Sequence, residues 1–323
     1  MHFPSWTTAG LMAAALLWSG AAPAQTPSRI EVAPLRTRTL TGEEFLRGNA
    51  PGKEATIAGE LRLPPGAADR VPVVILVHGS GGTSGSADLW AHELNSIGIA
   101  AYLLDSFAGR GIVSTVADQS QLNSLAMMVD AYRALDLLAA HPRIRPDRIA
   151  VMGFSKGAVA SVYSAMDRFT QAYGSPSHRF AAHIGLYTPC NVAYTGDTKL
   201  APVPVRLFHG IADDYVPIAP CRDYAARLKA AGVDVRLTEY PDAQHGFDNP
   251  LSPPLVDVPT AQSTRNCRLV EAAGGAINDA AGQPYALETS SCVAKGAHVG
   301  HNPQATTAVR AAVKEFLTST LLR

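Results

Sequence analysis

Short apolar runs alternate along the chain with longer segments of helical periodicity, beginning near Ala55. The short runs are rich in Val, Ile and Leu, which is typical of buried strands. The longest periodic segment, 119–140, carries apolar residues near a helical period and stops before Pro142. We expect strands at 55–63, 71–77, 99–104, 148–152, 181–187, 205–208 and 234–240, and helices at 87–97, 119–140, 219–231 and 305–322.

Strands that alternate with helices predict an α/β fold with a doubly wound, mostly parallel sheet and helices on both faces. The length suits one large domain, which we place at 25–323. The segment 249–303 departs from the pattern, because it is long and rich in Pro, Gly and Ala before the last helix. We expect a disulfide-tied insertion near the mouth of the site, with a small hairpin and a substrate wall.

The pentapeptide G-F-S-K-G at 153–157 follows the apolar run 148–152 and opens a segment able to be helical. A strand that turns sharply into a helix at G-x-S-x-G is a nucleophile elbow, which holds out the hydroxyl of its serine, here Ser155. Taken alone the pentapeptide is weak evidence, since an ordinary strand-to-helix loop looks the same. An elbow also requires a base, and a third group that orients the base.

Both groups are present on loops that follow later strands. Asp213 and Asp214 come after the run 204–210, and His245 comes after the run 234–240. Ligands bind beyond the carboxyl ends of parallel strands, so we expect these loops to converge on Ser155. The chain order Ser, Asp, His is that of α/β-hydrolase triads.

A glycine-rich turn, H-G-S-G-G at 78–82, follows the β-branched run 71–77. Such a turn lets backbone N–H groups face an oxyanion, and we expect donors at Ser80 or Gly81 together with Lys156. A phosphate-binding loop is the alternative reading. The turn lacks both the G-K-[ST] ending and the G-x-G-x-x-G spacing of such loops.

The segments H-G-S-G-G, G-F-S-K-G, G-I-A-D with the following V-P, and H-G-F resemble the dienelactone hydrolase family of the α/β-hydrolase superfamily. The resemblance covers 55–249 and implies that Asp213, three residues after Gly210, is the acid of the triad rather than Asp214. The namesake enzymes look to have a cysteine nucleophile, whereas this chain has Ser155. It is therefore similar to the esterase-like members of the family.

These motifs predict a serine hydrolase that cleaves a small-molecule or polymeric carboxylic ester through an acyl-enzyme, with Ser155, His245 and Asp213 as the triad. Neither a metal nor an organic cofactor is expected. His78 and His209 precede glycines at strand ends, and we expect them to pack beneath the site rather than bind a metal. Two alternatives remain open: an amidase, peptidase or depolymerase with the same triad, and a non-catalytic binding protein on the same fold.

Two cations are candidates for substrate binding. Arg110 follows the strand at 99–104 and could hold a substrate carboxylate, but the favoured interpretation is that it ties Asp105 or another acid. We expect the Lys156 ammonium to be solvated or paired. If both cations faced the pocket, they would favour anionic substrates.

The first 24 residues contain no Asp, Glu, Lys or Arg and end in A-P-A after an apolar stretch. They predict a secretory signal peptide at 1–24 and an exported protein, periplasmic or secreted, with no stable membrane insertion after cleavage. The chain has 27 basic and 27 acidic residues, and this balance argues against a nucleic-acid partner. The sequence leaves the oligomeric state open.

Four cysteines occur, at Cys190, Cys221, Cys267 and Cys292. An even number in an exported protein predicts two disulfides, for which three pairings are possible. We favour Cys190 with Cys221 and Cys267 with Cys292, because each pair brackets a local loop.

Overall fold

The computed structural model of the protein describes residues 1–2, 29–48, 50–67 and 69–323. Apart from residues 1–2, the predicted signal peptide lies outside the described residues. The main sheet is formed by β1 (Arg29–Thr39), β2 (Lys53–Leu63), β3 (Val71–Val77), β4 (Ala100–Asp105), β5 (Ile144–Phe154), β6 (His183–Leu186), β8 (Val205–Gly210) and β9 (Val235–Tyr240). The helices are α1 (Gly42–Arg47), α2 (Gly85–Asn95), α3 (Ser124–Ala139), α4 (Lys156–Tyr163), α5 (Asp167–Tyr173), α6 (Ala219–Ala230) and α7 (Pro303–Leu321).

Among the described residues the main sheet has the order β1-β2-β4-β3-β5-β6-β8-β9. The strands from β4 to β9 in this order run parallel, and β1 and β2 extend the sheet antiparallel at one edge. From β3 the chain first moves outward to β4 and then crosses back to β5 on the other side. The loops after β3 and β5 therefore diverge, which leaves a crevice at the carboxyl end of the sheet.

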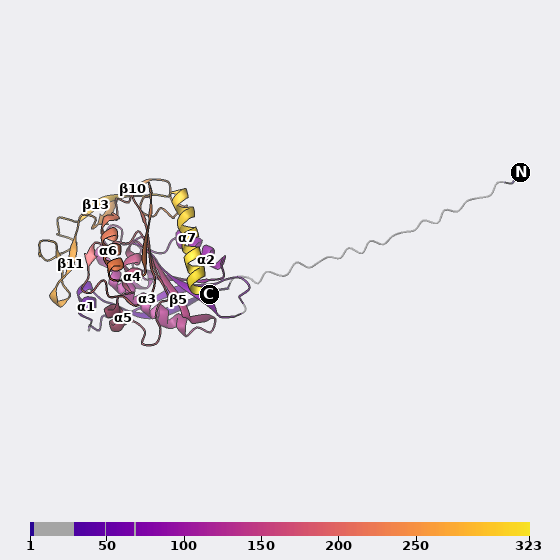
Figure 1. The fold of residues 1–323 in the computed structure, drawn as a ribbon, viewed down its shortest axis with the longest axis horizontal. Coiled ribbons are helices and arrows are strands. Elements are labelled where there is room, and N and C mark those ends of the chain that lie inside the picture. Colours follow the sequence, from indigo (N-terminus) through magenta and orange to yellow (C-terminus); the bar gives the residue numbers. More distant parts are fainter. Residues whose placement is uncertain (3–28, 49, 68) are drawn as a thin grey trace.

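Strand β3 shows why helices cover both faces of the sheet. Val73, Ile75 and Val77 are buried in a core that includes α3, α4 and α6, whereas Val74 and Leu76 are buried in a second core with α2 and α7. A strand with both faces apolar is stable only between two layers of helices. In Figure 1 the yellow α7 runs beside α2 on one side of the molecule. The predicted α/β sheet with helices on both faces is confirmed.

The structure departs from the sequence-based expectation in two regions of the chain. The helix expected at 119–140 begins only at Ser124, because the Asn123 side chain accepts a hydrogen bond from the N–H of Ala126 and caps it there. The preceding Gln119–Gln121 forms a short 3₁₀ turn, η2. Before Ala55, where no element was expected, the structure adds β1 and α1.

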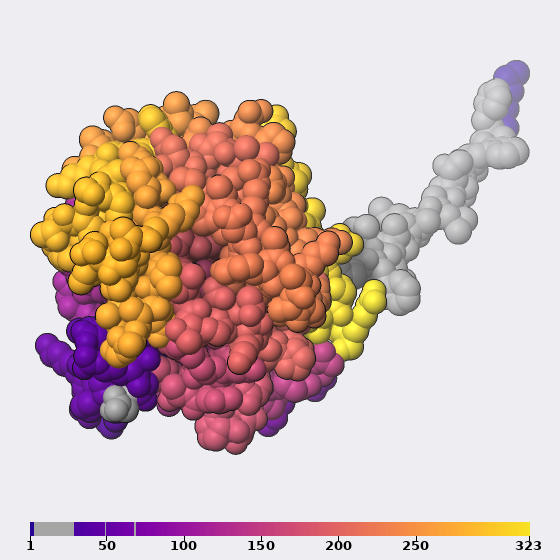
Figure 2. Space-filling model, turned by 60° about the vertical axis from the view of Figure 1, so that its left-hand side comes forward, coloured from indigo at the N-terminus to yellow at the C-terminus, as the bar shows by residue number. Residues whose placement is uncertain are grey.

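The insertion at 249–303 contains four short strands: β10 (Val256–Ser263), β11 (Leu269–Glu271), β12 (Ile277–Asp279) and β13 (Ala294–Val299). Strand β10 pairs with β13, and β11 pairs with both β12 and β7 (Val192–Ala193) of the main domain. In Figure 2 the insertion, orange to yellow, lies beside the indigo N-terminal part. The two meet where Arg47 Nε on α1 donates a hydrogen bond to the carbonyl of Gly274, in the 3₁₀ turn η3 (Ala273–Gly275).

Two disulfides are present, Cys190–Cys221 and Cys267–Cys292, the pairing favoured from the sequence. The first fixes the loop before β7, and the second closes the hairpin of β11 and β12 within the insertion. No helix in the described ranges is both long and apolar enough to span a membrane.

Candidate active site

Ser155 stands between β5 and α4 in a backbone conformation that L-residues rarely adopt, with φ 52° and ψ −117°. Its flanking glycines are required by close packing. A Cβ on Gly153 would lie 2.1 Å from the carbonyl oxygen of Gly157, and a Cβ on Gly157 would lie 2.2 Å from that of Val77. The pentapeptide therefore folds as the sharp turn that its pattern predicts, with the Ser155 hydroxyl at the crevice.

Ser155, His245 and Asp213 form a continuous hydrogen-bonded row. His245 Nε2 lies 2.9 Å from Ser155 Oγ, and His245 Nδ1 lies 2.8 Å from Asp213 Oδ2. The three side chains come from the loops after β5, β8 and β9, whose carboxyl ends meet at this edge of the sheet. All three are buried. This geometry can pass a proton from the serine to the imidazole.

The Asp213 carboxylate is held ionised by its neighbours. Its Oδ1 accepts hydrogen bonds from the backbone N–H groups of Tyr215 and Val216, and its Oδ2 lies 3.6 Å from His209 Nε2. Burial alone would raise the pKa of this carboxyl, but His245 and His209 outweigh burial and lower its pKa to about 2. Asp213 can therefore stabilise a protonated His245 throughout the neutral range.

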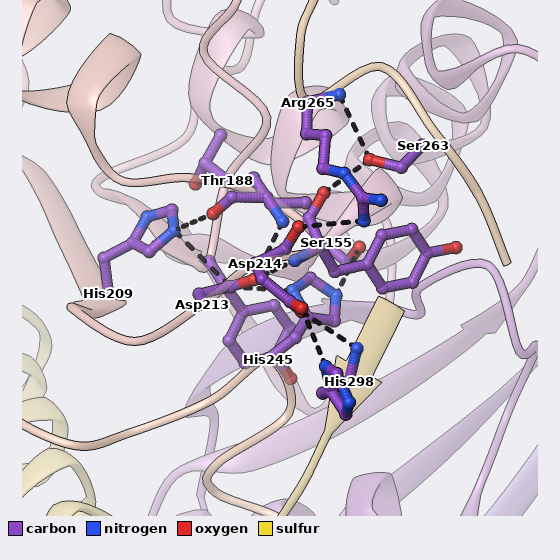
Figure 3. A network of polar contacts seen from close by, with 12 residues as sticks. Ser155, Thr188, His209, Asp213, Asp214, His245, Ser263, Arg265 and His298 are labelled. Carbon is purple, nitrogen blue, oxygen red and sulfur yellow. Dashed lines mark hydrogen bonds and ion pairs between the residues drawn. The ribbon is translucent and has the colours of Figure 1, made fainter. Parts of the chain in front are cut away.

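Asp214, the adjacent acid, points elsewhere, as Figure 3 shows. Its Oδ2 lies 2.7 Å from His298 Nδ1 on β13, and its Oδ1 accepts a hydrogen bond from the backbone N–H of the same residue. Its carbonyl accepts a hydrogen bond from Arg265 of the insertion. The pKa of His298 is raised by this carboxylate. Asp213 thus contacts His245, whereas Asp214 ties the insertion to the same loop.

The His245 ring lies between two tyrosines, with ring centroids 4.6 Å from Tyr187 and 4.8 Å from Tyr215. The Tyr187 hydroxyl donates a hydrogen bond of 2.9 Å to Asp248, which also accepts a bond of 2.6 Å from Trp90 Nε1. Burial raises the pKa of the Asp248 carboxyl, although both hydrogen bonds oppose the shift. No local pattern predicts this buried cluster, since Trp90, Tyr187 and Asp248 lie on three separate segments of the chain.

The glycine-rich turn lies beside Ser155. His78 is buried beneath the turn: its Nδ1 donates to the carbonyl of Gly79, and its Nε2 accepts from the N–H of Ser106. Within the described residues, the backbone N–H groups of Ser80, Gly81 and Lys156 donate no hydrogen bond to another protein group. Ser80 and Gly81 line the cavity at Ser155, and Lys156 directly follows Ser155 in the chain, so the predicted donors, Ser80 or Gly81 together with Lys156, remain candidates for binding a ligand oxygen.

The Lys156 ammonium is neither solvated nor ion-paired, so that expectation is wrong. The residue is only 6% exposed, and in the described part of the chain no carboxylate lies within ion-pair distance. Its Nζ donates to the backbone carbonyl and to Oε1 of Gln119, at 3.1 and 2.8 Å. Burial lowers the pKa of Lys156 to about 7, although Asp118 opposes the shift.

Gln119 is a site residue that the sequence reasoning missed, because the pattern placed it inside a helix. Its Nε2 lies 3.0 Å from Ser80 Oγ and 3.4 Å from the Tyr215 hydroxyl. Its backbone N–H donates to Gln262 of the insertion at 2.7 Å. One residue of the turn η2 thus connects the glycine-rich turn, Lys156 and the insertion.

Arg110 does not bind at the crevice, which corrects its place among the candidate substrate-binding residues. Its guanidinium pairs with Asp130 on α3, with contacts of 2.7 and 2.9 Å, and its side chain is 6% exposed. Asp105 instead accepts hydrogen bonds from the backbone N–H groups of Phe107 and Ala108. The favoured interpretation, that Arg110 ties an acid, therefore holds, and the acid is Asp130.

Two cavities meet at Ser155. The small chamber, about 220 Å³, lies between the glycine-rich turn and His245, and the large chamber, about 360 Å³, lies between Lys156 and the insertion. Ser80, Ser155 and Tyr215 line both. Ser155 therefore borders a cavity on each of two sides.

The fold and this row of side chains define a protein of the α/β-hydrolase class. The model of the dienelactone hydrolase family matches residues 57–273, more than half of the chain, and the chain belongs to this family. It is accordingly a hydrolase that acts on ester bonds. A comparison with curated proteins finds no match.

Two solved structures are similar in fold. A dienelactone hydrolase-like promiscuous phosphotriesterase from metagenomic libraries is 16% identical, with a TM-score of 0.57 over 90% of this chain and 98% of that chain. A protein called m3DLH is 18% identical, with a TM-score of 0.58 over 90% of this chain and 99% of that chain. At these identities the likeness is one of fold.

Proposed function

We propose that this protein is a serine carboxylesterase in which Ser155 is the nucleophile, His245 the general base and acid, and Asp213 the group that orients His245. The observation that carries the proposal is the buried row Ser155–His245–Asp213, with heavy-atom distances of 2.9 and 2.8 Å. The backbone N–H groups of Ser80, Gly81 and Lys156 also support the proposal, because they donate to no protein group among the described residues and ester hydrolysis requires donors for the oxyanion.

The reaction proceeds in two balanced steps. In the first, Ser155 Oγ bonds to the ester carbonyl carbon while His245 takes its proton, and the N–H groups of Lys156 and of Ser80 or Gly81 bind the oxyanion. The bond from carbon to the alcohol oxygen then breaks, and His245 gives its proton to the departing alcohol. In the second step His245 deprotonates water, which attacks the acyl-enzyme, and the acid leaves as Ser155 regains its proton.

Labelling with a fluorophosphonate probe tests the nucleophile. We expect a single adduct on Ser155 by peptide mass spectrometry, lost in Ser155→Ala and retained in Ser80→Ala, which removes a hydroxyl of the same cavity but keeps the backbone N–H. An adduct on Ser80, or no adduct in folded protein, would refute the proposal that Ser155 is the nucleophile. Turnover of ethyl acetate set against N-ethylacetamide then tests ester preference over amide.

We further propose that residues 1–24 are a signal peptide and that the mature, exported chain is a single domain. The two disulfides support this proposal, because disulfides persist in oxidising compartments. Expression of the full chain in a bacterium should yield periplasmic protein whose first residue is Gln25. Cytoplasmic protein that retains Met1 would contradict the proposal.

A further inference from the structure

The two chambers at Ser155 differ in the side of the triad that they reach. His245 and Gly246 line the small chamber, whereas Lys156 and Gln119 line the large chamber. In the proposed mechanism, on which this inference rests, His245 must protonate the oxygen of the departing alcohol. The alcohol therefore has to leave on the side of His245, and the acyl group has to lie on the opposite side.

The large chamber is suited to an apolar group. Its wall includes Leu125 and Val159 from the main domain, with Leu269, Ile277 and Leu287 from the insertion. Among the described residues that line it, Lys156 is the one that carries a charged group, and that group already donates to Gln119. An aliphatic chain placed here is removed from water without stripping a carboxylate or a guanidinium of its partners.

The small chamber has the smaller volume, and a larger share of its lining surface is polar than in the large chamber. It is bounded by the glycine-rich turn, by Ser84 and Ser86 at the start of α2, and by Asn249. Its volume of about 220 Å³ compares with about 360 Å³ for the large chamber. A short alcohol fits these dimensions better than a long one.

The insertion makes the large chamber, and the disulfides fix it. Strand β11, which supplies Leu269, pairs with β7 of the main domain directly after the Cys190–Cys221 bridge. The Cys267–Cys292 bridge closes the segment that supplies Ile277 and Leu287. The wall is therefore held at both ends rather than left to a free loop.

We propose that the large chamber is the acyl subsite and the small chamber the alcohol subsite, so that the substrates are esters of a bulky, apolar carboxylic acid with a short alcohol. The insertion sets the acyl preference through Ile277 and Leu287. The side chains around Ser86 set the alcohol preference.

Two ester series measured by pH-stat test the assignment: ethyl esters from acetate to octanoate, and acetates from methyl to octyl. For the wild type, kcat/KM should rise along the acyl series and fall along the alcohol series. Leu287→Trp should lower kcat/KM for ethyl octanoate at least about tenfold, since one misfitting methylene costs about 10 to 200-fold in a hydrophobic pocket. Its activity on ethyl acetate should change less than about twofold.

Ser86→Trp is the matched variant in the other chamber. It should lower kcat/KM for butyl acetate about tenfold and leave the ratio of ethyl octanoate to ethyl acetate unchanged. If Leu287→Trp impairs the long acetates and Ser86→Trp impairs ethyl octanoate, the two subsites are reversed. If neither variant alters chain-length dependence, the chambers do not bind substrate and the inference is wrong.

A binding measurement separates this inference from the proposed function. In the Ser155→Ala background, octanoate should bind by calorimetry, and Leu287→Trp should weaken its affinity about tenfold whereas Ser86→Trp should not. If octanoate binds with this pattern but the wild type, with Ser155 present, turns over no ester, the proposed function is refuted and the assignment of the large chamber as an acyl-binding site stands. Ester turnover with equal effects of both substitutions would refute the subsite assignment alone.

Discussion

Replacing Lys156 by Met should stabilise the protein at neutral pH, and the gain should shrink as the pH rises. The ammonium is buried and donates to Gln119, its one hydrogen-bond partner among the described residues, and burial lowers its pKa from 10.5 to about 7. At about 1.4 kcal/mol per pKa unit, this displacement costs about 5 kcal/mol of folding free energy while the lysine is charged in both states. Methionine removes the charge and keeps most of the volume.

The lowered pKa of Lys156 determines how this gain in stability changes with pH. Below about pH 7 the full cost is present in the wild type. Between about pH 7 and 10.5 the unfolded chain holds a proton that the folded protein has released, so wild-type stability rises by about 1.4 kcal/mol per pH unit. The variant lacks this slope. The free-energy cost of burying the ammonium, which Met removes, therefore falls to about 2 kcal/mol at pH 9. The variant also loses the two hydrogen bonds to Gln119, and each loss lowers the gain in stability by about 1 kcal/mol at every pH.

Urea unfolding followed by tryptophan fluorescence at pH 6 to 9.5 measures the difference between Lys156→Met and the wild type. We expect a net gain of about 3 kcal/mol at pH 7 that vanishes near pH 9. Lys229→Met, on the exposed side of α6, is the matched control and should show no such slope. A stability difference that stays flat between pH 7 and 9.5, or that equals the control, would refute the reasoning.

The remaining predictions concern the proposed acid of the triad, the buried ion pair of Arg110 with Asp130, and the insertion. Asp213→Asn should lower kcat for an ester by about 10⁴-fold because it favours the wrong tautomer of the base, whereas Asp214→Asn should lower it less than about tenfold; equal losses would overturn the choice of acid. Arg110→Met should cost about 3 to 5 kcal/mol in urea unfolding, because it leaves a buried carboxylate unpaired; a loss below about 1 kcal/mol would contradict that role. The double substitution Cys267→Ser with Cys292→Ser should cost about 3 kcal/mol for a loop of 25 residues and flatten the dependence of kcat/KM on acyl length; unchanged stability and unchanged chain-length dependence would show that the bridge does not hold the wall.

Much of the fold could be predicted from local pattern. The buried strands β3 and β8 were placed within two residues, because a strand that is covered on both faces is a continuous apolar run bounded by turn residues. The start of α3 could not be placed in the same way. Its capping residue Asn123 lies inside a longer run of helical periodicity, and a cap is fixed by a hydrogen bond to Ala126 rather than by hydrophobicity.

The sequence by itself determined which reactive side chains are present and in what order they follow along the chain. Ser155, Asp213 and His245 each follow a strand of one parallel sheet, so topology alone directs them to one edge. Gly153 is likewise fixed locally, since a Cβ there would lie 2.1 Å from the carbonyl oxygen of Gly157. Gly157 is instead required by a tertiary contact, because its Cβ would lie 2.2 Å from the carbonyl oxygen of Val77 on β3.

Only the tertiary structure decided which charges are paired and which residues surround Ser155. Arg110 contacts Asp130 and Lys156 contacts Gln119, partners that lie 20 and 37 residues away on other elements. The insertion forms a wall of the large chamber because β11 pairs with β7, and no local sequence pattern predicts this pairing. Burial and long-range contact set the electrostatics and shape of a site, and neither is a property of a short stretch of sequence.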